Sequence, residues 1–126
     1  MNEKKVVENL SITEKIASDV LFTSLYKSYG DYVKKIGKKI GKIKGIETSK
    51  FDSRANRFTY SLSFSGYTRG DLEAKGSVVF MFDGLEYDIF FTGDRPDFGG
   101  NYTKDFSGRR DLPEAKIIGE FENLFS

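Results

Sequence analysis

The chain contains no cysteine and no histidine. The absence of cysteine excludes disulfide bonds and thiol chemistry, and it removes any basis for a disulfide-dependent secreted fold. The absence of histidine removes the commonest general base, the commonest metal ligand and the partner of serine or cysteine nucleophiles. No recognisable catalytic spacing takes their place. We therefore expect a protein that is not an enzyme and that needs no metal or cofactor.

Long apolar runs are also missing. No window approaches the roughly 18 consecutive apolar residues of a membrane-spanning helix. The first residues lack the apolar core of a secretion signal, so we expect a soluble, cytoplasmic protein. At 126 residues the chain is predicted to form a single domain, 1–126. Its net charge is only +1, so any basic binding site must be a local cluster.

Alternating residues between Arg57 and Thr92 predict a sheet. Apolar side chains occupy every second position from Phe58 to Phe64, the period of a strand with one buried face. Val78–Phe82 and Leu85–Thr92 follow, joined by Asp83-Gly84, the dipeptide that favours a two-residue hairpin. With Ile43–Phe51 as the first strand, the pattern predicts a four-stranded antiparallel meander.

Two helices are expected beside this meander. Ser11-Ile12-Thr13-Glu14 has the form of a capping box, and the apolar residues after it recur at helical spacing. Gly30 leaves open one long helix or two segments, and the end is expected at or near Gly37. Residues 1–10 are expected to be frayed or to form a short helical turn. The fold class is thus α+β: an N-terminal amphipathic helix packed on the meander, with a short C-terminal helix beginning near Pro113.

The segment 93–112 is predicted to be a long loop, because it is rich in Gly, Asp and Arg and has no clear period. Arginines interleaved with aromatic residues are typical of interface hot spots. We predict that this segment binds a partner; the alternative is a strap whose aromatic rings cover the open side of the sheet. The predicted partner-binding residues are Arg95, Phe98, Tyr102, Phe106, Arg109 and Arg110.

A second candidate site is the run 34–45, which holds six lysines, three glycines and no acid. Clustered positive charge can neutralise the phosphates of nucleic acid or of lipid headgroups. The alternative is a solvated helix end, where lysines complement the negative end of the helix dipole. The predicted anion-binding residues are Lys34, Lys35, Lys38, Lys39, Lys42 and Lys44.

A third possibility is a cavity between helix and sheet, lined by Phe58, Tyr60, Phe80 and Tyr87, that would hold a small molecule. The carboxylates around Glu86 and Asp88 occupy the alternate positions of their predicted strand that face solvent, and their spacing fits no metal-binding loop. We expect them to be surface charges.

The order of features resembles a known family. The segments Ile36-Gly37-Lys38-Lys39-Ile40 and Ala74-Lys75-Gly76-Ser77-Val78, with the Gly66 to Gly70 turn between them, resemble the cytochrome-oxidase assembly factor family. They are similar as well to the soluble domain of a mitochondrial inner-membrane import-translocase subunit. The resemblance covers about residues 20–92 and implies a cystatin-like helix-on-sheet fold with a non-enzymatic assembly or docking role. The sequence differs from that family in lacking the preceding membrane segment and in having the tail 93–126. No functional residue is carried over, because the shared positions are glycines and alternating apolar residues.

The leading hypothesis is a non-catalytic protein-binding module, such as an adaptor, an assembly factor or an inhibitor of a larger complex. The alternatives are a binder of nucleic acid or anionic membrane through the lysine run, and a small-molecule pocket protein or enzyme.

Overall fold

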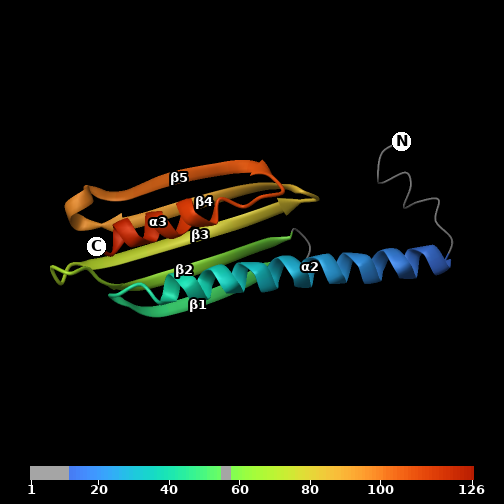
Figure 1. Cartoon of the computed structure of the whole chain (residues 1–126), viewed down its shortest axis with the longest axis horizontal. Coiled ribbons are helices and arrows are strands. Elements are labelled where there is room, and N and C mark those ends of the chain that lie inside the picture. Colours follow the sequence, from blue (N-terminus) through green and yellow to red (C-terminus); the bar gives the residue numbers. More distant parts are fainter. Residues whose placement is uncertain (1–11, 55–57) are drawn as a thin grey trace.

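A computed structural model describes the backbone of residues 12–54 and 58–126 and the side chains of residues 27–54 and 58–126. Its centre is a five-stranded antiparallel sheet in the order β1-β2-β3-β4-β5. Two helices lie on one face of this sheet, and the other face is open (Figure 1). The elements are α2 (Ile12–Gly41), β1 (Ile46–Arg54), β2 (Thr59–Tyr67), β3 (Glu73–Asp83), β4 (Glu86–Arg95), the 3-10 turn η2 (Pro96–Phe98), β5 (Gly100–Arg109) and α3 (Glu114–Leu124).

The α+β class, the meander and the short C-terminal helix are confirmed, but the sheet has five strands and the prediction of four was wrong. The fifth strand, β5, lies in the segment expected to be a loop. The loop was predicted because this segment is rich in glycine. Two of these glycines instead lie in strands, each opposite a tyrosine whose ring occupies the space that a side chain would need. Gly93 pairs with Tyr102, and Gly108 pairs with Tyr87. A Cβ at Gly93 would lie 2.7 Å from the Tyr102 ring, so only glycine lets this ring cross the neighbouring strand.

Helix α2 is a single continuous helix, so the expected end near Gly37 was also wrong. Gly37 faces the sheet, where an added Cβ would lie 2.9 Å from the Leu62 side chain. This glycine therefore allows close packing, and the helix continues through it to Gly41. The first turns of α2 project beyond the sheet, as Figure 1 shows. The predicted cap at Ser11 and the segment 1–10 lie outside the described residues.

The core fills the space between the helices and the inner face of the sheet. Phe64, Phe91 and Phe121 meet edge to face there, with ring centroids 5.0–5.1 Å apart. Among the described side chains, those buried from α2 are Val33, Ile36 and Ile40, and those buried from α3 are Ile117, Phe121 and Leu124. Tyr60 and Phe80, which were expected to line a cavity, are fully buried in this core.

The open face of the sheet is polar. Cross-strand rows of serine and threonine, such as Ser63, Ser77 and Thr92, alternate with charged residues on it. Its large apolar or aromatic residues are few, and among them are the half-exposed Tyr67, Met81 and Phe90. In the described part of the chain, no helix has the length and apolar character needed to cross a membrane.

Candidate functional site

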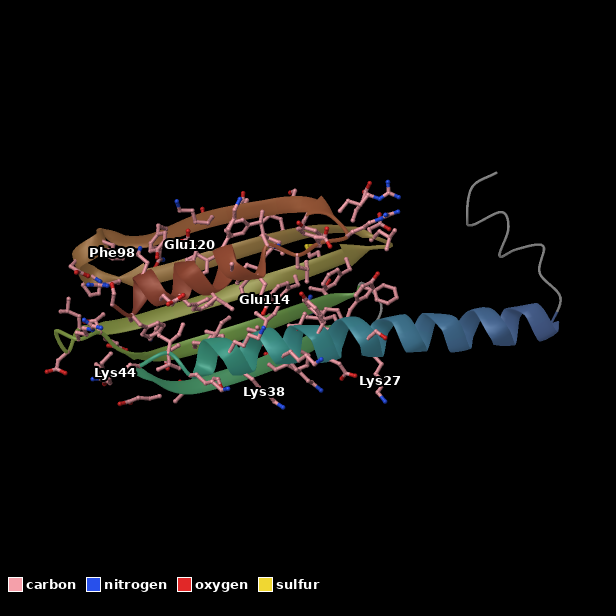
Figure 2. The ribbon with its side chains drawn as sticks, in the orientation of Figure 1. Lys27, Lys38, Lys44, Phe98, Glu114 and Glu120 are labelled. Carbon is pink, nitrogen blue, oxygen red and sulfur yellow. The ribbon has the colours of Figure 1, made fainter. Side chains whose placement is uncertain are left out.

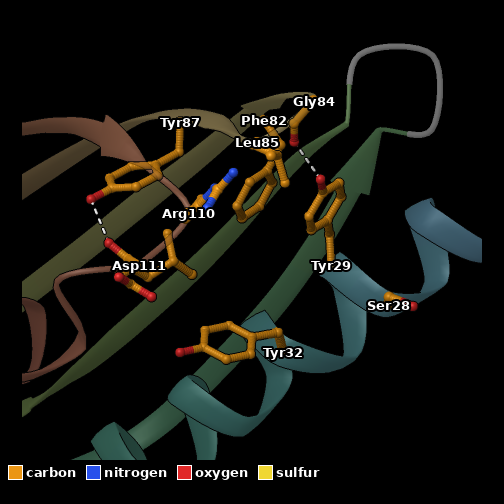
Figure 3. A pocket seen from close by; sticks show the side chains of 10 residues that line it. Ser28, Tyr29, Tyr32, Phe82, Gly84, Leu85, Tyr87, Arg110 and Asp111 are labelled. Carbon is orange, nitrogen blue, oxygen red and sulfur yellow. Dashed lines mark hydrogen bonds between the residues drawn. The ribbon is translucent and has the colours of Figure 1, made fainter.

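A cleft of about 430 Å³ lies at the end of the sheet where the β3–β4 hairpin, α2 and the β5–α3 connection meet. We call it the hairpin cleft. Figure 3 shows Tyr29 and Tyr32 of α2 on one wall and the hairpin on the other. Its lining residues are Ser28, Tyr29, Tyr32, Phe82, Gly84, Leu85, Tyr87, Arg110, Asp111 and Leu112.

Two tyrosines of the hairpin cleft are fixed by their own hydroxyl groups. Tyr29 donates a hydrogen bond to the Gly84 carbonyl oxygen, and Tyr87 donates one of 2.7 Å to the Asp111 carbonyl oxygen. The Tyr29 ring also stacks on Phe82, with centroids 4.3 Å apart. Because these hydroxyls are engaged within the protein, the two residues present mainly rigid aromatic surface to the cleft.

The charged groups of the hairpin cleft come from the connection between β5 and α3. Arg110 has a left-handed backbone, with φ +68°, and its amide donates a hydrogen bond of 2.7 Å to the Leu85 carbonyl oxygen. Its side chain is exposed and forms no ion pair or hydrogen bond with another described residue. For a non-glycine residue this backbone conformation lowers the stability of the fold, and strained residues of this kind are common at functional sites.

Tyr32 connects the cleft to a charged pair on its flank. Its hydroxyl donates to Glu114 Oε2 at 3.2 Å, and Glu114 also pairs with Lys39. Partial burial, together with the Glu114 carboxylate, raises the pKa of Tyr32. The hydrogen bond from Lys39 lowers the pKa of Glu114, and the same bond raises the pKa of Lys39. At neutral pH the Tyr32 phenol is therefore uncharged, and Lys39 and Glu114 are both charged and form an ion pair.

The hairpin cleft thus offers apolar surface with one free guanidinium group and one carboxylate, that of Asp111. Over residues 27–54 and 58–126, no three acidic side chains come together in a way that could hold a metal ion. The chemistry available is apolar contact combined with recognition of a negative charge.

The six predicted partner-binding residues fall at separate places between the end of β4 and the residue after β5. Arg95 is buried and donates from Nη1 to the Leu124 carbonyl oxygen at 3.0 Å, so it caps the end of α3. It also pairs with Asp97 at 2.9 Å, which lowers the pKa of that carboxyl group. Phe98 lies over the Arg95 guanidinium at 4.2 Å and against the ring of Tyr102. This cluster is at the opposite end of β5 from Arg110, about 30 Å away for a strand of this length.

The other members of the set are divided as well. Phe106 pairs with Ile89 on the inner face and is half-buried against the core. Arg109 pairs with Glu86 on the open face. Only Arg110 contributes to the hairpin cleft.

The six predicted anion-binding lysines lie on α2 or directly after it. Lys39 pairs with Glu114, and Lys34 Nζ lies 5.0 Å from the Phe51 ring centroid. The remaining four, Lys35, Lys38, Lys42 and Lys44, are exposed.

Tyr29, Tyr32 and Leu85 of the cleft were not among the predicted site residues. The two tyrosines stand three positions apart, which places them on one side of a helix. Leu85 directly follows the predicted Asp83-Gly84 turn. These signals concern local structure, and the sequence carries no sign that α2 and the hairpin meet.

Comparison with known proteins does not assign the chain to a class. No family model matches it, and no curated protein or solved structure is significantly similar to it.

Proposed function

We propose that this protein is a non-catalytic protein-binding module and that the hairpin cleft is its binding site. The cleft takes an apolar side chain of the partner, and Arg110 pairs with a carboxylate beside that side chain. The proposal includes the cystatin-like helix-on-sheet arrangement and the docking role that the sequence resemblance implies, and it places the protein in the cytoplasm.

The observation that carries this proposal is the exposed apolar rim beside a free arginine. Leu85 is 51% exposed and Tyr32 is 40% exposed, and both border the same cleft as the unpaired Arg110. Tyrosine and arginine are enriched among the residues that dominate interface energies. A rim of this kind extends the contact surface beyond the cleft, which suits a protein chain better than an enclosed ligand.

The rigidity of the cleft gives further support. Tyr29 and Tyr87 are held by hydrogen bonds to backbone carbonyl groups, so little side-chain freedom remains to be lost when a partner binds. The left-handed conformation of Arg110 fits the same interpretation, because a glycine would relieve the strain but would remove the guanidinium group.

Peptide display provides the test. A random peptide library is selected against the folded protein, and the enriched peptides are expected to place an aromatic or aliphatic residue close to an aspartate or glutamate. Binding of these peptides is expected to fall by at least about tenfold in Leu85→Glu and in Arg110→Glu, since each change removes one contact and adds a repulsive charge.

A matched control is available at the other end of the sheet. Leu72 and Arg69 are exposed in the β2–β3 turn, so Leu72→Glu and Arg69→Glu make the same chemical changes away from the cleft. These two variants should bind like the wild type. Equal loss in all four variants, or enrichment of peptides without the apolar and acidic pair, would contradict the proposal.

A small-molecule carrier is the second candidate, because the cleft volume lies within the roughly 300–1,000 Å³ range of ligand pockets. The expected ligands would be aromatic carboxylates. A thermal-shift screen that finds such stabilisers, while no peptide is enriched, would favour this candidate over the first.

A further inference from the structure

The exposed side of α2 carries a row of lysines that the proposed function does not use. We call it the lysine face: Lys27, Lys34, Lys35 and Lys38 of α2 and Lys42 directly after it, with Asp31 as the one acidic residue among the described exposed positions on this side. Helical spacing places these positions on the side of the helix opposite to the buried Val33, Ile36 and Ile40. Figure 2 shows Lys27 and Lys38 pointing away from the sheet. The row is about 22 Å long.

The charges of the lysine face are not neutralised by the fold. Lys27, Lys35, Lys38 and Lys42 form no ion pair with any residue in the described part of the chain. Neighbours four positions apart in α2, such as Lys34 and Lys38, carry like charges, which weakens an isolated helix. Lys39 differs, because it lies on the flank towards α3 and pairs with Glu114. Most of the charges on this face therefore lack a partner within the described residues and are available for binding.

The opposite side of the molecule has the reverse charge. Seven carboxylates and four basic side chains lie on the open face of the sheet, as the strand register places them. Within the described residues, the lysine face and the open face of the sheet thus carry opposite charge. An extended anionic surface would attract the lysine face and repel the open face of the sheet, and this fixes a single orientation. The acidic residues of the open face are Asp52, Glu73, Asp83, Glu86, Asp88, Asp94 and Asp105.

We propose that the lysine face docks on an anionic lipid surface, with α2 lying along the membrane plane. Clustered lysines on a helix are typical of contact with anionic lipids, and an elongated cluster fits an extended plane of headgroups. The face holds no arginine, amide or aromatic side chain of the kind that reads bases, which disfavours sequence-specific nucleic acid. The hairpin cleft does not share these lysines, so the two proposals stand or fall independently.

Vesicle sedimentation tests this proposal. The wild type is expected to sediment with phosphatidylcholine vesicles that contain phosphatidylserine, to remain free with phosphatidylcholine alone, and to dissociate as salt is raised. Lys38→Glu with Lys42→Glu should weaken binding by at least about a hundredfold, because each lysine near the surface contributes and each glutamate is repelled.

The control variant is Lys50→Glu with Lys75→Glu, which has the same net charge but alters the open face of the sheet. It should sediment like the wild type, and circular dichroism of both variants checks that they are folded. Absence of binding to anionic vesicles at low salt, or equal loss in both double variants, would overturn the proposal. Tighter binding to duplex DNA than to the vesicles would also overturn it and would assign the face to nucleic acid.

Discussion

Replacing Arg110 by glycine separates the cost of this residue to folding from its role in binding. Its backbone is left-handed, at φ +68°. For a non-glycine residue this conformation costs about 1–2 kcal/mol, which glycine avoids. Glycine also makes the unfolded chain more flexible, which offsets roughly 0.5–1 kcal/mol of that gain. The side chain itself adds little to stability, since within the described residues it has no ion pair or hydrogen bond.

We therefore expect Arg110→Gly to raise the free energy of unfolding by about 0.5–1 kcal/mol, which raises the melting temperature by about 3 °C. The same variant should lose affinity for the peptides selected on the hairpin cleft. Urea denaturation and peptide titration measure the two effects separately. Asp71→Gly is the matched control, because Asp71 also has a left-handed backbone, at φ +61°, but lies in the β2–β3 turn. It should change stability in the same direction and leave peptide affinity unaltered.

Two results would refute this reasoning. A loss of more than about 1 kcal/mol in Arg110→Gly would mean that the side chain holds the fold, in which case its conformation is no sign of function. A more stable variant that binds peptides as tightly as the wild type would mean that the guanidinium group is not a contact.

Three further predictions concern the fold around the cleft and the opposite end of the sheet. Gly93→Ala should lower the free energy of unfolding by about 1–3 kcal/mol, because its Cβ would press on the Tyr102 ring. In a urea double-mutant cycle, this loss should be smaller when Tyr102→Ala is also present, and simple additivity would contradict the packing argument. Arg95→Ala should cost about 2 kcal/mol in urea denaturation, because α3 loses its charged cap; an unchanged midpoint would show that the cap is dispensable. The pair of Lys39 and Glu114 should stabilise the fold above the ordinary glutamate pKa and below the ordinary lysine pKa, since folding lowers the pKa of Glu114 and raises that of Lys39. Thermal melts should show Glu114→Gln below the wild type near neutral pH, with the gap closing as acid protonates Glu114; a gap independent of pH would contradict this.

Features set by neighbours in sequence could be predicted. The alternation from Phe58 to Phe64 predicted β2, which begins at Thr59. Asp83-Gly84 predicted the hairpin, and Gly84 has the expected positive φ of +58°. The turn residues were wrong by one position, because Asp83 pairs with Glu86 in the sheet and the two-residue turn is Gly84-Leu85. The C-terminal helix followed from its apolar spacing and starts at Glu114, directly after Pro113. In each case the local chemistry and the tertiary environment favour the same structure.

Features that depend on distant partners could not be predicted. Gly93 looks like a loop residue until Tyr102 is placed beside it, and Gly37 looks like a helix end until Leu62 packs against it. The candidate site depends on distant partners in the same way. Arg110 was identified from composition, but its separation from Arg95 follows from β5 being a strand that spans the sheet.

The central claim, that the hairpin cleft is a binding site, is tested most directly by NMR. A selected peptide is titrated into the isotope-labelled protein, and the backbone amide shifts are followed. We predict that the perturbed signals gather at Tyr29, Tyr32, Leu85 and Arg110 while those of the open face around Phe90 remain unchanged. Perturbations centred on the open face, or spread evenly over the sheet, would contradict the claim.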